Sequence, residues 1–275
     1  MSTPGAPPTG GWGPTCGSTP HPRRCSGPGR TVPCWPRRRP RPRIGEHVPD
    51  QMIPRSTVRL SPLRYVLPAG TELWRVHNAQ WGATQFKAVP ADLHWGGGRF
   101  CDIPDGLRSG KVPYLYAAKS PLTALCETLA RDLEMPDNGR RRITQRKIRG
   151  TLLSKVIAAA DLPLIDLTNA EGLTAVHQDH WLVTSSARHY ARTRRWGSWI
   201  RSQTSWATGF RWPSRQDFGP HTADAFVLYE DEGGPDLLKP SAEDSLELNS
   251  PEGRDYVNSL LEPLKIRVEP PRKRT

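Results

Sequence analysis

The chain has 275 residues, enough for one large domain or two small ones. Its 39 Lys and Arg residues exceed its 27 Asp and Glu residues, but residues 1–60 alone hold ten arginines against two acids. The rest of the chain holds 29 basic and 25 acidic side chains, so its charge does not indicate a nucleic-acid-binding fold. No apolar run approaches the roughly 18 residues of a membrane span, so no membrane partner is expected.

The cysteines and histidines do not predict a metal site. The five cysteines stand at positions 16, 25, 34, 101 and 126, without the close Cys pairs that structural zinc sites use. The eight histidines are scattered and show no ligand spacing. An odd number of cysteines and the lack of a secretory signal fit a cytoplasmic protein.

The first part of the chain is typical of a tail. Residues 1–55 are rich in Pro, Gly, Ser, Thr and Arg, which bury too little apolar surface to offset the entropy lost on ordering, so we expect disorder. The run Arg37–Arg43 fits a nucleic-acid-binding arm, or a dispensable or over-extended start before Met52, and we favour the second interpretation. We expect a folded domain at 56–265 and a basic tail at 266–275.

The folded part opens with a strand and then a strand–helix unit. Leu73–His77 alternates in hydropathy as a strand does, and the Tyr- and Val-rich segment 112–118 is the next predicted strand. Ser120 is a good N-cap, and Pro121 suits the first helical position. The apolar stripe of this helix consists of Leu122, Leu125, Cys126, Leu129 and Leu133.

The second half predicts strands and helices without a repeating βαβ rhythm. Strands are expected at 147–156, 162–167, 207–212 and 225–229, and helices at 184–201 and 252–261, with Thr168 capping a short helix between them. This pattern is typical of an α+β domain with a mixed sheet and flanking helices.

Glu127 is the acid in the helix that begins at Pro121. At 100° per residue it lies about 140° from the centre of the leucine stripe, so it has Thr123, Ala124 and Ala130 as neighbours. Periodicity alone favours an exposed side chain paired with Arg131, one turn later. The alternative is that the small neighbours leave room for a ligand, and this side of the helix then faces a cleft.

Two arginines are candidates for binding an anion. Arg99 follows Gly96-Gly97-Gly98, and glycines let the backbone approach a phosphate that an arginine can clamp. Neither a dinucleotide fingerprint nor a Walker loop surrounds it, and a flexible turn with a surface arginine is the alternative. Arg75 stands in the middle of the first strand; if buried, it needs a partner such as Glu127, a ligand phosphate or a structural acid.

A serine follows the strand predicted at 207–212. Ser214 lies between Arg211 and Arg215, without the Gly-x-Ser-x-Gly elbow that presents a nucleophile. A hydrogen-bonding serine is therefore favoured over a nucleophilic one, and a plain strand-end turn is the alternative.

Taken in order, these segments resemble the RES-domain family. The resemblance spans roughly residues 70–230, and its segments are Leu73-Trp74-Arg75-Val76, Gly97-Gly98-Arg99-Phe100, Tyr114-Leu115-Tyr116-Ala117-Ala118, Ala124-Leu125-Cys126-Glu127 and Trp212-Pro213-Ser214-Arg215. It implies a single RES domain, similar in fold to ADP-ribosyltransferases and preceded by the disordered tail.

The resemblance also implies an activity and partners. RES-domain proteins resemble the toxin halves of bacterial toxin–antitoxin pairs, and they consume NAD by phosphorolysis or hydrolysis of the nicotinamide–ribose bond. NAD is then the substrate, inorganic phosphate is a candidate co-substrate, and no cofactor is needed. The implied partner is a cognate helix-turn-helix antitoxin, which supplies the contact with nucleic acid; a homo-oligomer is left open. The alternatives are a protein ADP-ribosyltransferase and a non-catalytic protein that binds nucleic acid through the basic arm.

By the same resemblance, five residues fall on active-site positions: Arg75, Arg99, Tyr116, Glu127 and Ser214. Glu127 is expected to stabilise the ribosyl cation, together with catalytic Arg75 and Arg99. These two arginines also bind the pyrophosphate of NAD or an incoming phosphate. Tyr116 is expected to stack on the nicotinamide, and Ser214 to orient that ring or a ribose hydroxyl.

Overall fold

A computed structural model describes residues 58–87, 97–101, 112–217, 223–230, 236–243 and 245–270. The predictions of a disordered tail at 1–55 and of a basic arm at Arg37–Arg43 lie outside these ranges, as does Gly96. No helix in the described ranges is both long and apolar enough to cross a membrane.

A mixed sheet forms the centre of the fold and confirms the predicted α+β class. Its hydrogen-bonded order is β1-β6-β7-β8-β3-β2-β5-β10, with β9 also paired to β5, and only β6 and β7 run parallel. The strands are β1 (Arg64–Leu67), β2 (Glu72–Asn78), β3 (Tyr114–Ala118), β5 (Thr151–Ala158), β6 (Leu162–Asp166), β7 (Gly209–Pro213), β8 (Asp224–Tyr229), β9 (Leu238–Pro240) and β10 (Leu246–Glu247). A second, parallel pair joins β4 (Arg141–Ile143) to β11 (Ile266–Val268).

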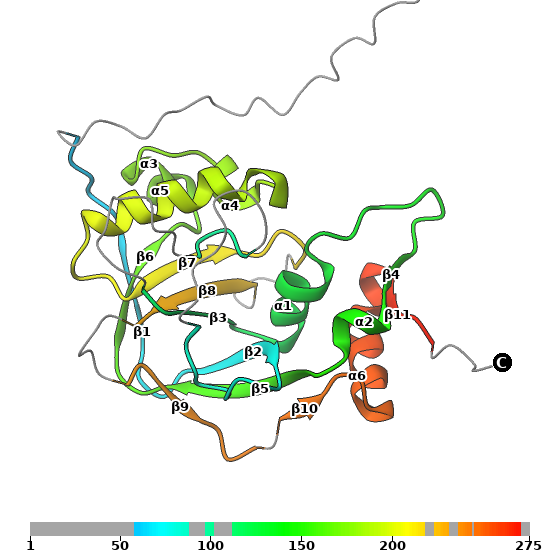
Figure 1. The fold of residues 1–275 in the computed structure, drawn as a ribbon. Coiled ribbons are helices and arrows are strands. Elements are labelled where there is room, and N and C mark those ends of the chain that lie inside the picture. The colour runs from blue at the N-terminus through cyan, green and yellow to red at the C-terminus, as the bar shows by residue number, and fades with distance from the viewer. Residues whose placement is uncertain are drawn as a thin grey trace, which may run out of the picture. The chain divides into compact units, whose positions relative to one another are not determined.

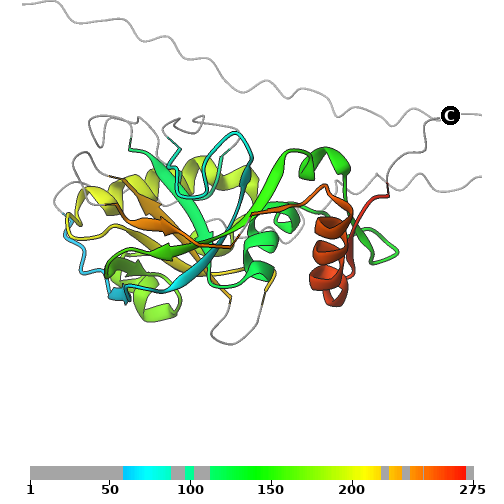
Figure 2. The same cartoon turned by 90° about the horizontal axis from the view of Figure 1, so that it is seen from below.

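The helices form two groups. They are α1 (Pro121–Leu125), η1 (Cys126–Ala130), α2 (Gln145–Ile148), α3 (Ala170–Ala175), α4 (Trp181–Thr184), η2 (Ala187–His189), α5 (Tyr190–Ser202), α6 (Pro251–Leu261) and η3 (Glu262–Leu264). Figures 1 and 2 show α6 beside β4 and β11 at the end of the main sheet. Buried side chains of α3, α4 and α5 pack on β7 and β8. Those of α1, η1 and α6 belong to a second cluster with side chains of β3, β2 and β5. A third apolar cluster covers the opposite face of the sheet.

The strand–helix unit confirms the predicted cap and corrects the predicted helix. Ser120 Oγ accepts the Thr123 N–H at 3.1 Å, and Pro121 occupies the first turn. After Leu125 the helix changes to a π-turn over Cys126–Ala130, so the uniform α spacing predicted for this stretch is wrong. π-turns are rare and concentrate at functional sites, because they change which way a helical side chain points.

Two other boundaries differ from the sequence predictions. The strand predicted from residue 147 begins at Thr151, because Gln145–Ile148 form a short helix. The helix predicted at 184–201 is divided into α4, η2 and α5, and Tyr190 begins the long part.

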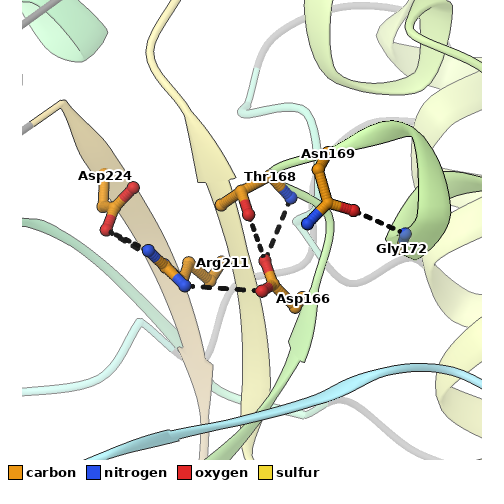
Figure 3. Close-up of polar contacts among 6 residues, drawn as sticks. All are labelled: Asp166, Thr168, Asn169, Gly172, Arg211 and Asp224. Carbon is orange, nitrogen blue, oxygen red and sulfur yellow. Dashed lines mark hydrogen bonds and ion pairs between the residues drawn. The ribbon is translucent and has the colours of Figure 1, made fainter. Parts of the chain in front are cut away.

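A polar cluster, drawn in Figure 3, fixes the strand ends of β6, β7 and β8. Arg211 Nε donates to Asp224 Oδ2 at 2.9 Å, and Arg211 Nη1 donates to Asp166 Oδ2 at 3.4 Å. Asp166 Oδ1 accepts from both the backbone N–H and the hydroxyl of Thr168. Thr168 is therefore not the helix cap that the sequence predicts; Asn169 is, because its side chain accepts the Gly172 N–H at 2.8 Å. The cluster holds the strand from which Ser214 emerges.

The C-terminal residues form structure where the sequence predicts a tail. Ile266 and Val268 are buried, and β11 pairs with β4 in a register that places Arg267 beside Arg142. The sequence signal is weak because the strand is only 3 residues long.

Candidate active site

The candidate site lies where β2 and β3 part. The two strands share one ladder pair, Trp74↔Ala118, and Tyr114 further along β3 pairs with Lys87 instead. Two cavities adjoin this opening, of about 400 Å³ and about 40 Å³. Both are lined by Val76, Tyr116, Glu127, Thr128 and Arg131. The larger volume falls in the range of small-molecule sites.

Glu127 lies at the junction of these cavities and hydrogen-bonds to Ser214. Ser214 Oγ donates to Glu127 Oε1 at 2.7 Å, although the two residues are 87 positions apart in the sequence. The i,i+4 pair with Arg131 does not form, because the Arg131 guanidinium pairs with Asp132 at 3.2 Å. The cleft alternative for this side of the helix is therefore the one that the structure bears out.

The turn after β7 presents the Ser214 hydroxyl to Glu127. Ser214 is buried, and its Oγ accepts the backbone N–H groups of Gln216 and Asp217 at 3.3 and 3.4 Å. Asp217 in turn accepts a 2.6 Å hydrogen bond from the hydroxyl of Thr123 in α1. The turn and the helix are thus joined at two points, and these contacts fix the position of the Glu127 carboxylate.

Arg99 reaches the smaller cavity from the glycine loop. Its Nη1 donates to the backbone oxygen and the hydroxyl of Ser185, at 2.9 and 3.0 Å, and its guanidinium lies 5.1 Å from the Tyr190 ring centroid. Burial lowers its pKa, while the nearby Tyr190 and Glu127 act in the opposite direction. Its Nε–H is buried without a hydrogen-bond partner among the described residues.

Tyr116 holds the loop that carries Arg99. Its hydroxyl accepts the Phe100 N–H at 2.8 Å, and its ring makes an edge contact with Trp212. A Cβ atom at Gly98 would stand 2.5 Å from this hydroxyl, so only glycine lets the loop approach so closely. Burial raises the pKa of Tyr116 well above its usual value, and the side chain stays a neutral phenol.

Arg75 lines the larger cavity and has carbonyl partners rather than a carboxylate. Its Nη1 donates to the backbone oxygens of Gly82 and Ala83 at 3.2 and 2.6 Å. Burial lowers its pKa to about 10, which still leaves the guanidinium charged at neutral pH. Arg75 and Arg99 therefore line different cavities, and Glu127 lines both.

The family model described as the RES domain matches residues 72–248. The chain belongs to the RES-domain family. The match begins at β2 and ends after β10, so it includes all five of the residues that the resemblance singled out.

One solved structure is similar to this RES domain, and no curated protein matches its sequence. That structure is the crystal structure of the M. tuberculosis MbcT–MbcA toxin–antitoxin complex, with 15% sequence identity and a TM-score of 0.46. The similarity covers 73% of this chain and 91% of that chain.

The structure adds three residues to the site that sequence reasoning missed. Arg131 lines both cavities and lies 5.0 Å from the Tyr190 ring centroid, so Tyr190 stands between two guanidinium groups. Trp212 lines the smaller cavity beside Tyr116. The position of Arg131, four residues after Glu127, is a sequence signal for its place in the site. Nothing in the sequence indicates that Tyr190 lies near Glu127 or Arg131.

A buried histidine also lines the larger cavity of the RES domain. His77 Nε2 lies 2.8 Å from Ser154 Oγ, and its Nδ1 lies 3.1 Å from the Asn78 backbone oxygen. Burial and the neighbouring Arg75 lower its pKa, so the ring is neutral at pH 7. Both ring nitrogens of His77 have hydrogen-bond partners within the protein, so His77 helps to hold the wall of the cavity.

The described ranges contain no cluster of three or more His, Cys, Asp or Glu side chains placed to hold a metal ion. Within these ranges, the two cavities are lined by one carboxylate together with arginines, aromatic rings and a hydroxyl group.

Proposed function

We propose that this RES domain is an enzyme that cleaves the nicotinamide–ribose bond of NAD. The observation that carries the proposal is the Glu127 carboxylate, held by Ser214 at the junction of two cavities that Arg75, Arg99 and Arg131 also line. A fixed carboxylate flanked by guanidinium groups suits a substrate that develops positive charge beside a pyrophosphate.

Each side chain has a role in this reaction. Glu127 accepts hydrogen bonds from ribose hydroxyls and stabilises the cationic ribose, while Ser214 positions Glu127. Arg99 and Arg131 supply positive charge for a phosphoryl oxygen in the smaller cavity, and Arg75 supplies a further charge in the larger cavity. Tyr116 carries the Arg99 loop and provides an aromatic wall for the nicotinamide.

The reaction balances without a further cofactor. The C–N bond between nicotinamide and ribose breaks, its electron pair leaves with neutral nicotinamide, and the ribose carbon becomes an oxocarbenium ion. A water oxygen then attacks that carbon and releases a proton, giving ADP-ribose. If inorganic phosphate attacks instead, the product is ADP-ribose 1″-phosphate.

Family membership supports a biological role as the toxin of a toxin–antitoxin pair in the cytoplasm. NAD loss would stop growth, so the host needs a cognate antitoxin, which we propose is of the helix-turn-helix type. Contact with nucleic acid is then made through that antitoxin.

Product analysis tests the proposal. Purified protein is incubated with NAD labelled in its adenosine part, with and without inorganic phosphate, and nicotinamide release is followed by chromatography. We expect nicotinamide release, and phosphate dependence will separate phosphorolysis from hydrolysis. Addition of cell extract tests the ADP-ribosyltransferase alternative, because only transfer places the label on protein. Absence of nicotinamide release under every condition contradicts the proposal.

A further inference from the structure

A third cavity, of about 790 Å³, lies away from the proposed NAD-cleavage site. It is lined by residues of β4, α6, η3 and β11, and Figures 1 and 2 show β4, β11 and α6 grouped together. We call it the β4–β11 groove. The family match ends at residue 248, so α6, η3 and β11 lie beyond the part of the chain that RES domains share.

Basic side chains dominate the lining of this groove. The basic residues are Arg140, Arg141, Arg142, Arg254, Lys265 and Arg267, and the acidic ones are Asp255, Glu262 and Glu269. Five of the six basic residues are arginines, whose planar guanidinium groups match phosphoryl oxygens two at a time. The composition therefore favours a phosphorylated ligand.

The strand register places like charges side by side. Arg142 on β4 pairs with Arg267 on β11, and both side chains are exposed, whereas Ile143, Ile266 and Val268 are buried beneath them. Neighbouring strands lie about 4.8 Å apart, so two guanidinium groups emerge at close spacing. Like charges opposite each other destabilise a sheet, and a bound anion removes that cost.

Acids within the protein neutralise little of this charge. In the described part of the chain, Arg267 lies 3.8 Å from Glu262, while Arg140, Arg142 and Lys265 have no acid within ion-pair distance. The Arg267–Glu262 pair is exposed, with both side chains 67% accessible, so it is weak. The exposed guanidinium groups are available to a ligand.

Arg141 is directed to the buried face of the strand pair, opposite to Arg142 and Arg267. Its side chain is 8% exposed, and its Nη1 and Nη2 donate to Gln216 Oε1 and to the Leu264 backbone oxygen at 2.8 and 3.4 Å. Its Nε–H is buried and has no partner among the described residues, although Arg141 lines the groove. Because this donor is enclosed by protein, Arg141 holds β4 against its surroundings, and the exposed Arg142 and Arg267 are the arginines that a ligand in the groove meets.

We propose that the β4–β11 groove binds a compact ligand carrying two or more phosphoryl groups. Arg142 and Arg267 bind one phosphoryl group, and the exposed Arg140 and Lys265 of the same lining contact the next. Three acids line the same groove and repel an extended polyanion, and among the described residues no aromatic side chain lines it for base stacking. These features favour a small phosphorylated molecule over a nucleic-acid strand.

Calorimetric titration of the full chain with inorganic pyrophosphate tests this proposal. The test variant is Arg142→Gln with Arg267→Gln, and the matched control is Arg146→Gln, an exposed arginine on α2 outside the groove. We expect the double variant to bind pyrophosphate at least about tenfold more weakly, and the control to bind like wild type. Nicotinamide release by the double variant should equal that of wild type, so failure here is distinct from failure of the proposed function.

Two results overturn the proposal. Equal pyrophosphate affinity in wild type and the double variant shows that any binding occurs elsewhere, such as at Arg99 and Arg131. A short single-stranded RNA that binds far more tightly than pyrophosphate, with a steep salt dependence lost in the double variant, shows an extended polyanion site instead. Thermal unfolding of both variants confirms that they are folded.

Discussion

Replacing Ser214 by alanine tests how strongly the site depends on a positioned carboxylate. The change removes the 2.7 Å hydrogen bond to Glu127 Oε1 and two weaker acceptor contacts within the turn. A hydrogen bond to a charged group contributes about 1.5–3 kcal/mol. If the whole of that energy stabilises the transition state, its loss lowers kcat/KM for NAD by roughly 10- to 150-fold.

A double-mutant cycle separates this effect from general damage. Ser214→Ala, Glu127→Gln and the double variant are compared by nicotinamide release, and their folding is checked by thermal unfolding. Because Ser214 acts through Glu127, Ser214→Ala should cost little further activity once Glu127 is glutamine. Ser259→Ala is the matched control, since Ser259 is an exposed serine on α6 whose hydroxyl donates to a backbone oxygen.

Two outcomes would refute the positioning role. In the first, folded Ser214→Ala retains wild-type kcat/KM. In the second, the losses of the two single variants add fully in the double variant, which means that Ser214 acts on the substrate independently of Glu127.

Three further predictions follow from the contacts around the site. Gly98→Ala forces the loop away from Tyr116, and a displaced Arg99 should lower kcat/KM on the order of tenfold to a hundredfold in steady-state kinetics; an unchanged value contradicts the close approach. Thr123→Val leaves the buried Asp217 without a 2.6 Å hydrogen bond and should destabilise the fold by about 1–3 kcal/mol in urea unfolding, whereas a neutral effect means that this contact is dispensable. The lowered pKa of His77 means that the unfolded chain binds this proton more readily, so stability present above pH 6.5 is lost as the pH falls below it. In thermal unfolding, His77→Gln should therefore lose less stability than wild type as the pH is lowered. An unaltered pH profile would mean that other groups cause the loss of stability at acid pH.

The sequence predicted the parts of this site that depend on local chemistry. The cap at Ser120 and the strand at Leu73–His77 follow from propensity and alternation, and the structure confirms both. The segments around Arg99, Glu127 and Ser214 are brought together by the sheet order, which places β7, β8, β3 and β2 side by side. Their order along the chain, rather than any one motif, made them recognisable.

The parts that could not be predicted depend on long-range contacts. Helical periodicity favoured an exposed Glu127 beside Arg131, because neither the π-turn nor the partner 87 residues away leaves a local signal. Tyr190, at the start of α5, also lines the site through long-range contacts that leave no local sequence signal. The strand β11 is too short for its pattern to be distinguished from a polar tail, and its pairing with β4 stabilises it.

The central claim is that the Glu127 carboxylate is required for cleavage of NAD. The most direct measurement is the rate of nicotinamide release by Glu127→Gln, compared with wild type and with Glu134→Gln, which alters an exposed acid seven residues later. Glutamine keeps the shape of the side chain but removes the charge that would stabilise the ribosyl cation. The account predicts release by wild type and Glu134→Gln and a loss of roughly a hundredfold or more in Glu127→Gln, as removal of one transition-state charge contact produces. Equal rates in all three proteins would contradict it.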